Sequence, residues 1–342
     1  MKWFQWILSP LSLIYWFITD SRNRLYDGGI FKETKFSIPV IGIGNITVGG
    51  TGKTPHCEYV GRILSKKNHI AVLSKGYGRK TTNFKYVELS NKSFEVGDEP
   101  LQTKHNFPDQ IVAVDHQRVN GIERIIKDFP KIKTIILDDA FQHRSVKIGF
   151  NILLCDFNNP IFEDYIMPLG KLRESRKGVK RADCVIVTKC PESLQYKEAN
   201  DIEKKLNCKE VFFTKIKYDH IISVYDHLKI GNINNKSVIL VTGIANSEPI
   251  LKYLKTLNVN SRHLKYSDHY NYNTSDVKRI ISNYNEITKD SIILTTEKDA
   301  QKLREFKELS SFPLYYLKVS VDFLWNKDKF EKKIKDYVES YS

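Results

Sequence analysis

The sequence predicts an α/β protein, with one parallel sheet covered by helices and a second, smaller α/β unit nearer the C-terminus. Two observations lead to this prediction. Short apolar runs recur without the polar alternation of a half-exposed strand, and stretches of helical character separate them. The chain has 342 residues, which is the length of about two ordinary domains.

The order of these runs gives the expected elements. Strands are expected at 38–45, 70–73, 111–114, 132–137, 151–155 and 184–187, with a helix at 56–67. The pattern changes near 208–226, where 211–216 and 221–225 are extended and rich in β-formers. Beyond them we expect strands at 237–241, 263–265 and 292–294, helices at 247–256 and 275–282, an extended run at 313–319 and a charged helix at 327–338.

These elements suggest five segments. They are an N-terminal helix (1–25), a first α/β domain (26–210), a β linker (211–233), a smaller α/β domain (234–312) and a return strand with a C-terminal helix (313–342). The first segment contains WFQWILSPLSLIYWFI at 3–18, which is shorter than the roughly 20 residues that span a bilayer. An aromatic-rich helix with basic flanks suits a membrane interface, and packing on its own domain is the alternative.

Charge and cysteine content narrow the class of protein. The chain has 54 Lys and Arg against 40 Asp and Glu, a net charge of +14. Such a surplus favours an anionic partner, which could be nucleic acid, an anionic membrane or a phosphorylated substrate. The five cysteines form no C-x-x-C pair, which fits a reducing compartment and neither a disulfide framework nor a zinc site.

The clearest chemical motif is Thr47-Val48-Gly49-Gly50-Thr51-Gly52-Lys53-Thr54, between an apolar strand and a helical stretch. It fits the phosphate-loop pattern G-x-x-x-x-G-K-[ST] except that Thr47 stands at the first glycine. Glycines let backbone N–H groups converge on phosphate oxygens. Lys53 can then reach the β- and γ-phosphates, and the Thr54 hydroxyl can bind Mg²⁺.

Other polar clusters carry weaker signals. Asp138-Asp139 ends an apolar strand, where paired carboxylates can hold Mg²⁺. Asp98-Glu99, between Gly97 and Pro100, could accept a hydroxyl proton, although an ordinary acidic turn accounts for the spacing more simply. The cations of 74–80 and 171–181 suit an anionic group or a solvated loop. A lone His269 is more often structural, and Thr296 with Asp299 resembles a helix cap.

Nine segments, taken in order, resemble one family. They are 44–55 (GNITVGGTGKTP), 73–79 (LSKGYGR), 97–100 (GDEP), 137–143 (LDDAFQH), 168–174 (PLGKLRE), 181–183 (RAD), 242–245 (TGIA), 268–270 (DHY) and 296–300 (TEKDA). Together they resemble the tetraacyldisaccharide 4′-kinases, the lipid A 4′-kinase family. Thr47 at the first glycine position is a trait of that family. Lys75 stands where the family usually has Arg, and Ala140 where it usually has Gly.

The resemblance implies a fold, an activity and a location. The first domain would be a P-loop kinase domain. The enzyme would transfer the γ-phosphate of ATP to the 4′-hydroxyl of a tetraacylated glucosamine disaccharide 1-phosphate, giving lipid IVA. It would work with Mg²⁺ at the cytoplasmic face of the inner membrane, as a peripheral or N-terminally anchored protein, and would bind no nucleic acid.

The resemblance also implies roles for particular residues. Asp98 would be the catalytic base with His269 as its partner, and Lys53 would act on the transferred phosphate. Nucleotide would bind residues 47–54. The metal would be held by Thr54, Asp138, Asp139 and Glu99, and the acceptor would be contacted by Tyr77, Arg79, Arg118 and Arg173.

Two other functions remain open at this point. One is a P-loop kinase or GTPase of the metallochaperone type, because Val187-Thr188-Lys189-Cys190 weakly resembles a guanine-reading loop. Preference for guanine over adenine would favour it. The other is a basic nucleic-acid-binding ATPase, although neither an RNP-like motif nor a helix-turn-helix pattern is found. Salt-sensitive binding to DNA would favour that function.

Overall fold

The computed structural model describes residues 3–66, 68–287 and 290–341. The first two residues of the predicted N-terminal helix and the last residue of the predicted C-terminal segment lie outside this range. The strands are β1 (Val40–Asn45), β2 (Ile70–Ser74), β3 (Lys85–Tyr86), β4 (Ile111–Val114), β5 (Thr134–Asp138), β6 (Phe150–Asp156), β7 (Cys184–Thr188), β8 (Val211–Ser223), β9 (Lys229–Ile230), β10 (Ser237–Thr242), β11 (Asn260–Lys265), β12 (Ser291–Thr296) and β13 (Leu314–Phe323). The helices are α1 (Trp3–Asp27), α2 (Lys53–Ser65), α3 (Ser93–Val96), α4 (Asp98–Asn106), α5 (Arg118–Asp128), α6 (Tyr196–Leu206), α7 (Glu248–Thr256), α8 (Thr274–Asn285), α9 (Glu297–Leu303) and α10 (Lys327–Glu339), with short 3₁₀ helices at Arg176–Arg181 and Lys307–Ser311.

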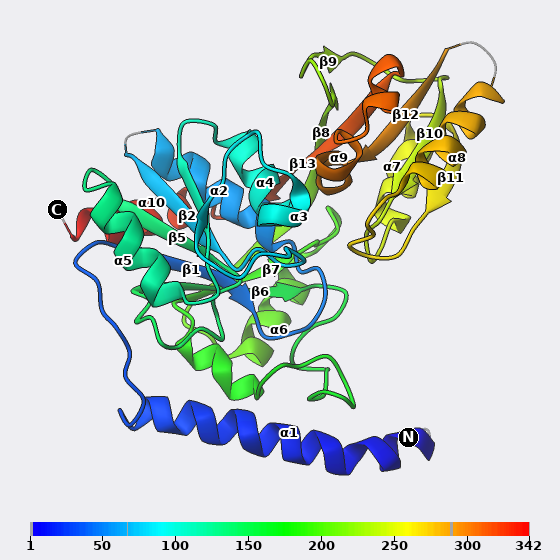
Figure 1. Cartoon of the computed structure of the whole chain (residues 1–342). Coiled ribbons are helices and arrows are strands. Elements are labelled where there is room, and N and C mark those ends of the chain that lie inside the picture. Colours follow the sequence, from blue (N-terminus) through cyan, green and yellow to red (C-terminus); the bar gives the residue numbers. More distant parts are fainter. Residues whose placement is uncertain (1–2, 67, 288–289, 342) are drawn as a thin grey trace.

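One sheet runs through both units of the molecule. Its strand order is β11-β10-β12-β13-β8-β7-β6-β1-β5-β2-β4-β3, with β9 beside β8. Pairing is parallel except at β8–β13, β8–β9 and β3–β4. Figure 1 shows the second unit, in yellow and orange, joined to the first by β8 and β13. The α/β class with a mostly parallel sheet is therefore the architecture found.

Buried apolar residues on both faces of the first unit's sheet explain its continuous apolar strands. On one face, α2 and α10 pack on the sheet through Val60, Leu64 and Phe330. Another cluster brings α5 onto the sheet through Ile122 and Ile125. A strand covered on both faces has no solvent side, so it needs no alternation of polar residues.

β8 differs from the sequence prediction, which has separate extended segments at 211–216 and 221–225. The structure has one continuous strand. Its first residues pair with β7 in parallel, and the rest pair with β13 antiparallel. The intervening residues 217–220 are exposed or half-buried, so they give no apolar signal, yet β13 pairs with Lys217 and Tyr218 among them before the register shifts.

The predicted acidic turn at Gly97–Pro100 is instead the beginning of helix α4, and Asp98 is its first residue. Pro100 fits the first turn because its missing N–H has no intrahelical partner there. The carboxylates of Asp98 and Glu99 are also favoured at the positive end of the helix dipole. The helix start places these two carboxylates next to each other at the surface that faces α9.

Helix α1 lies along one side of the first unit, at the bottom of Figure 1. Several of its large apolar side chains are exposed, namely Leu11, Leu13, Ile14, Phe17 and Ile18. Its C-terminal part is tied to the domain, because Arg22 Nη2 donates to the Gln142 carbonyl at 3.0 Å and Arg144 Nη1 lies 2.8 Å from Asp27 Oδ1. Among the described residues, no helix combines the length and apolarity needed to cross a bilayer.

Candidate active site

The phosphate loop lies in the middle of the sheet, because β1 has β5 on one side and β6 on the other. The loop leaves β1 after Asn45, and α2 begins at Lys53. Gly49 and Gly52 have φ values of 103° and 84°, a region that glycine enters without the strain of a side chain. The Thr188 hydroxyl donates to the Thr51 carbonyl at 3.0 Å, which ties the loop to the end of β7.

His56 supports the end of this loop from inside the domain. Its Nδ1 lies 2.7 Å from the Gly52 carbonyl oxygen, which can only accept, so Nδ1 carries the proton. Burial lowers the pKa of His56 to about 4, so the ring is neutral at physiological pH. Its Nε2 then accepts from the Thr214 hydroxyl at 3.0 Å. No sequence motif pointed to His56.

Asp138 and Asp139 follow β5, the strand beside β1. Burial, followed by the charges of Glu99 and Asp139, raises the pKa of Asp138 to about 7. The buried Oδ1 of Asp138 has no hydrogen-bond partner. Burial also opposes ionisation of Asp139, but Lys53 and Arg173 outweigh it and lower the pKa of that carboxyl. Asp139 Oδ1 lies 3.6 Å from Lys53 Nζ and 3.3 Å from Arg173 Nη1.

Asp98 is the point at which the two units meet. Its Oδ2 lies 3.3 Å from Nδ1 of His269 and 3.0 Å from Nζ of Lys302, both in the second unit. Burial would raise the pKa of Asp98. The neighbouring His269 and the charges of Lys298 and Lys302 outweigh that effect and hold the pKa well below its usual range. Asp98 is therefore ionised although its side chain is buried.

The next residue, Glu99, connects Asp98 to the phosphate loop. Burial and the charge of Asp98 raise its pKa, while Lys298 and Lys53 act in the opposite direction. The charges of Glu99 and Lys53 also act on Asp138. The structure thus gathers Lys53, Glu99, Asp98 and the β5 carboxylates into one charged site.

Helix α9 supplies the two lysines of this site. The Thr296 hydroxyl caps it by accepting from Asp299 N at 3.0 Å, as the Thr296–Asp299 spacing predicts. Lys298 and Lys302 are four residues apart and therefore share one face of the helix. Lys298 lies in the segment 296–300 that contributes to the family resemblance and Lys302 follows it, but neither lysine was predicted to have a role. Their i, i+4 spacing was the available signal.

A second buried group of charges joins α9 to the first unit. Lys318 Nζ, on β13, lies 2.5 Å from Glu297 Oε1 and 3.6 Å from Glu58 Oε2 of α2. Asn106, the last residue of α4, donates to both carboxylates. Burial and the charge of Glu58 raise the pKa of Glu297 to about 7. This cluster links α2, α4 and α9, the helices that begin at or beside the site.

The four expected acceptor-binding residues lie in different surroundings. The exposed Tyr77 packs its ring against that of His269, with centroids 4.8 Å apart. Arg79 is occupied within its own loop, where its guanidinium donates to the carbonyls of Asn83 and Thr82. Arg118 is buried and donates to the Asp115 carbonyl and, at 3.4 Å, to the Asp138 carbonyl.

Arg173, the fourth of them, holds Asp139 and also donates to Gln142 Oε1 at 3.4 Å. Tyr77 and Arg173 therefore contact residues of the charged site. Arg118 is buried beneath it and binds the Asp138 backbone, and the described contacts of Arg79 are made within its own loop.

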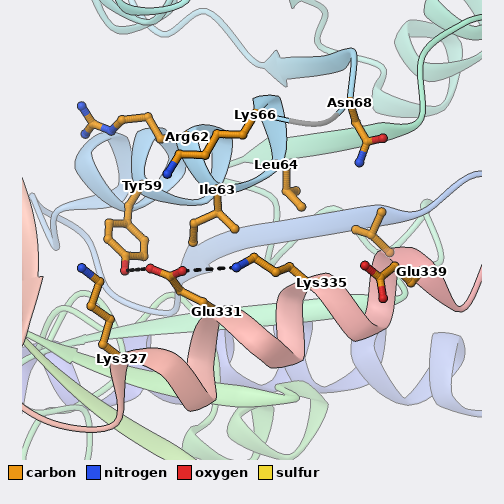
Figure 2. A pocket seen from close by; sticks show the side chains of 11 residues that line it. Tyr59, Arg62, Ile63, Leu64, Lys66, Asn68, Lys327, Glu331, Lys335 and Glu339 are labelled. Carbon is orange, nitrogen blue, oxygen red and sulfur yellow. Dashed lines mark hydrogen bonds and ion pairs between the residues drawn. The ribbon is translucent and has the colours of Figure 1, made fainter.

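A cavity of about 350 Å³ lies elsewhere, between α2 and α10 (Figure 2). There the Tyr59 hydroxyl donates to Glu331 Oε1 at 2.8 Å, and Lys335 pairs with the same carboxylate. The α2 residues that line it come from the half of the helix remote from Lys53. None of the predicted catalytic, nucleotide or metal residues lines this cavity, so it is separate from the charged site.

Comparison with known proteins decides the family. The family model described as Tetraacyldisaccharide-1-P 4′-kinase, LpxK, matches residues 4–339. The chain belongs to this family. The LpxK family thus accounts for nearly the whole chain, including α1 and α10. The predicted family, the α/β fold and the enzyme class, a kinase, are confirmed.

Individual relatives agree with the LpxK assignment. The chain is 44% identical to the tetraacyldisaccharide 4′-kinase of Flavobacterium psychrophilum, over 99% of this chain and 98% of the relative. It is 38% identical to that of Bacteroides thetaiotaomicron, over 98% and 93%. A crystal structure of the "apo" form of LpxK from Aquifex aeolicus in complex with ATP matches with a TM-score of 0.79 and 28% identity, over 98% of this chain and 99% of that one.

Proposed function

We propose that this chain transfers the γ-phosphate of ATP to the 4′-hydroxyl of a tetraacylated glucosamine disaccharide 1-phosphate, forming lipid IVA. The contact of Asp98 with His269 carries the proposal. It places a buried, ionised carboxylate between the two units and beside the charged residues that follow the phosphate loop. A phosphoryl-transfer site needs such an acceptor for the proton of the attacking hydroxyl.

The nucleotide would occupy the loop of residues 47–54. Its backbone N–H groups, at the positive end of α2, suit phosphate oxygens. Lys53 is in place to neutralise charge on the transferred group, an effect often worth several kcal/mol. Lys53 is held near Asp139 in this structure, 3.6 Å from its Oδ1, and can exchange that contact for phosphate.

Mg²⁺ fits the residues next to this loop. The buried Asp138 Oδ1 has no hydrogen-bond partner, and Glu99, Asp138 and Asp139 concentrate negative charge. Within the described residues no group of three or more His, Cys, Asp or Glu side chains is arranged to hold a metal. Mg²⁺ commonly takes one or two carboxylates and completes its shell with water and phosphate. Of the predicted set Thr54, Asp138, Asp139 and Glu99, one or two carboxylates and the Thr54 hydroxyl would hold it, and it would offset charge on the phosphates.

Asp98 would accept the 4′-hydroxyl proton. As the hydroxyl oxygen bonds to the γ-phosphorus, the bond from that phosphorus to the bridging oxygen of ADP breaks, and the proton passes to Asp98. His269 and Lys302 lie beside Asp98 and favour its ionised form, so the carboxylate is available to accept the proton.

The acceptor is an anionic lipid, and the surface of the chain suits it. The net charge is +14, and α1 exposes apolar side chains while its C-terminal part contacts the loop after Asp139. We therefore place the enzyme at the cytoplasmic face of the inner membrane, with α1 at the interface.

The direct test is a reaction of the purified protein with ATP, Mg²⁺ and the disaccharide 1-phosphate. We expect one new phosphate on the 4′ position, located by ³¹P–¹H correlation, and none with the Lys53→Ala variant. Phosphate on another position, or no lipid product, would contradict the proposal. Faster reaction with GTP than with ATP would favour the metallochaperone-type alternative.

A further inference from the structure

We propose that Lys298 is a positioning residue that fixes His269 as a neutral ring carrying its proton on Nδ1, toward Asp98. The inference rests on the proposed function, because it concerns the partner of the proposed base. It assigns a role to a residue of α9 that lies across the unit boundary from the phosphate loop.

The contacts of the ring determine where its proton is. Lys298 Nζ lies 2.9 Å from His269 Nε2. An ammonium group has donors and no acceptor, so Nε2 must be the bare nitrogen that accepts. Nδ1 then carries the only ring proton, and it faces Asp98 Oδ2 at 3.3 Å. The opposite tautomer would place an ammonium against N–H and a bare nitrogen against a carboxylate.

The position of Lys298 is itself well defined. Its Nζ lies 3.4 Å from Asp268 Oδ1 and 4.0 Å from Glu99 Oε1, in addition to its contact with His269. Its side chain is only 16% exposed. Two acceptors within hydrogen-bond reach and a further carboxylate at 4.0 Å surround this ammonium group, so it is held between the two units rather than free in solvent.

The backbone fixes the ring from the other side. His269 has φ of 55°, and its N–H donates to the Gly243 carbonyl at 3.1 Å and to Asp268 Oδ1 at 3.0 Å. Tyr77 packs against the ring face from the first unit. The ring orientation is therefore set by the loop, and Lys298 keeps Nε2 without a proton.

This arrangement has a chemical consequence. With Nε2 occupied by Lys298, His269 has no free nitrogen to take a second proton and pass it on. His269 therefore orients the Asp98 carboxylate as a donor, and the proton of the acceptor is not relayed through the ring. Without Lys298, Nε2 is free to take a second proton, and the ring can become an imidazolium beside Asp98 that passes protons on.

The first test reads the tautomer directly and needs no activity. Protein labelled with ¹⁵N-histidine is studied by long-range ¹H–¹⁵N correlation, and His269 is assigned from the signal lost in His269→Ala. We expect a neutral ring protonated at Nδ1 alone in the wild type and in Lys298→Arg, and a ring that also takes a proton on Nε2 in Lys298→Met, because Asp98 still holds the Nδ1 proton. A wild-type ring that is doubly protonated or protonated at Nε2, or an unchanged ring in Lys298→Met, would overturn the inference.

The second test separates positioning from binding. Lys298→Met should lower kcat about 10- to 100-fold, the scale of a misplaced catalytic group, with KM for ATP within about twofold. Lys298→Arg should recover part of the loss, because guanidinium is also only a donor. The matched control is Lys236→Met, which removes an exposed pair with Asp290 in the same unit. A raised KM with unchanged kcat would make Lys298 a nucleotide ligand and overturn the proposal.

Different results would contradict the proposed role of Lys298 and the proposed kinase activity. A wild-type protein without kinase activity contradicts the proposed function, and the NMR result is then judged by itself. An active wild type with normal kcat in Lys298→Met contradicts only the role of Lys298.

Discussion

Lys318→Met should destabilise the protein strongly, and by an amount that depends on pH. The lysine is 11% exposed and is the cation between Glu58, fully buried, and Glu297, 7% exposed. Removing one partner of a buried ion pair typically costs about 3–5 kcal/mol, because the remaining charge stays buried. We expect a loss in this range at pH 8, where Glu297 is ionised.

The loss should be smaller at pH 6. Glu297 has a folded-state pKa raised from 4.5 to about 7, so its ionisation in the wild type costs stability as pH rises through that interval. In Lys318→Met no cation offsets the cost of ionising the buried Glu297. This loss of stability therefore continues to grow as pH rises above 7. At pH 6 Glu297 is mainly protonated in both proteins, and the loss should fall toward about 1.5–3 kcal/mol, the value of one charged hydrogen bond.

The assay is urea unfolding followed by far-ultraviolet circular dichroism and tryptophan fluorescence, with free energies compared only if both probes coincide. Lys236→Met, at a surface ion pair whose Asp290 partner is exposed, should cost less than about 1 kcal/mol at both pH values. The triple variant Glu58→Gln, Glu297→Gln, Lys318→Met should regain much of the loss, because no buried charge remains. A loss below about 1 kcal/mol at pH 8, or an equal loss at both pH values, would refute the reasoning.

Three further predictions concern the site and the membrane. Lys53→Ala should abolish nearly all turnover with an unchanged circular dichroism spectrum, and near-normal kcat would contradict the phosphate-loop assignment. Asp138→Asn and Asp139→Asn should each raise the Mg²⁺ concentration needed for half-maximal activity, because an amide is a weaker ligand for a hard cation; wild-type Mg²⁺ curves in both would exclude the metal role. Deleting residues 1–20 should release the protein from membrane fractions while activity on detergent-dispersed lipid persists in part. If the truncated protein stays in the pellet, the anchor lies elsewhere, most simply in the basic segment 171–181.

Much of the first unit can be predicted from the sequence because its strands are buried on both faces. Runs such as Ile111–Val114 have no polar alternation and match β4 residue for residue. The phosphate loop is equally recognisable, since glycines and a lysine at this spacing, between a strand and a helix, are typical of phosphate binding. β8 was harder to predict because residues in its middle are exposed or half-buried. Such residues can pair with β13 through the backbone without an apolar pattern in the sequence.

Some of the site residues can likewise be predicted from the sequence, and others cannot. Asp138-Asp139 follow a recognisable strand, so their place next to the phosphate loop could be predicted. The contact of Asp98 with His269 joins residues far apart in sequence, and spacing alone gave an acidic turn and a structural histidine; only the family resemblance paired them. Lys298, Lys302 and Lys318 look like ordinary surface lysines in sequence, because their burial depends on how the second unit packs on α4.

The central claim is that Asp98 and His269, from different units, act as one catalytic pair. A double-mutant cycle tests it most directly, with kcat measured for Asp98→Asn, His269→Ala and the double variant. Loss of the base should lower kcat about 10²–10⁴-fold. His269→Ala should cost less, and the double variant should be no worse than Asp98→Asn, because members of one unit are not additive. Losses that multiply in the double variant would show that the two residues act independently and would contradict the claim.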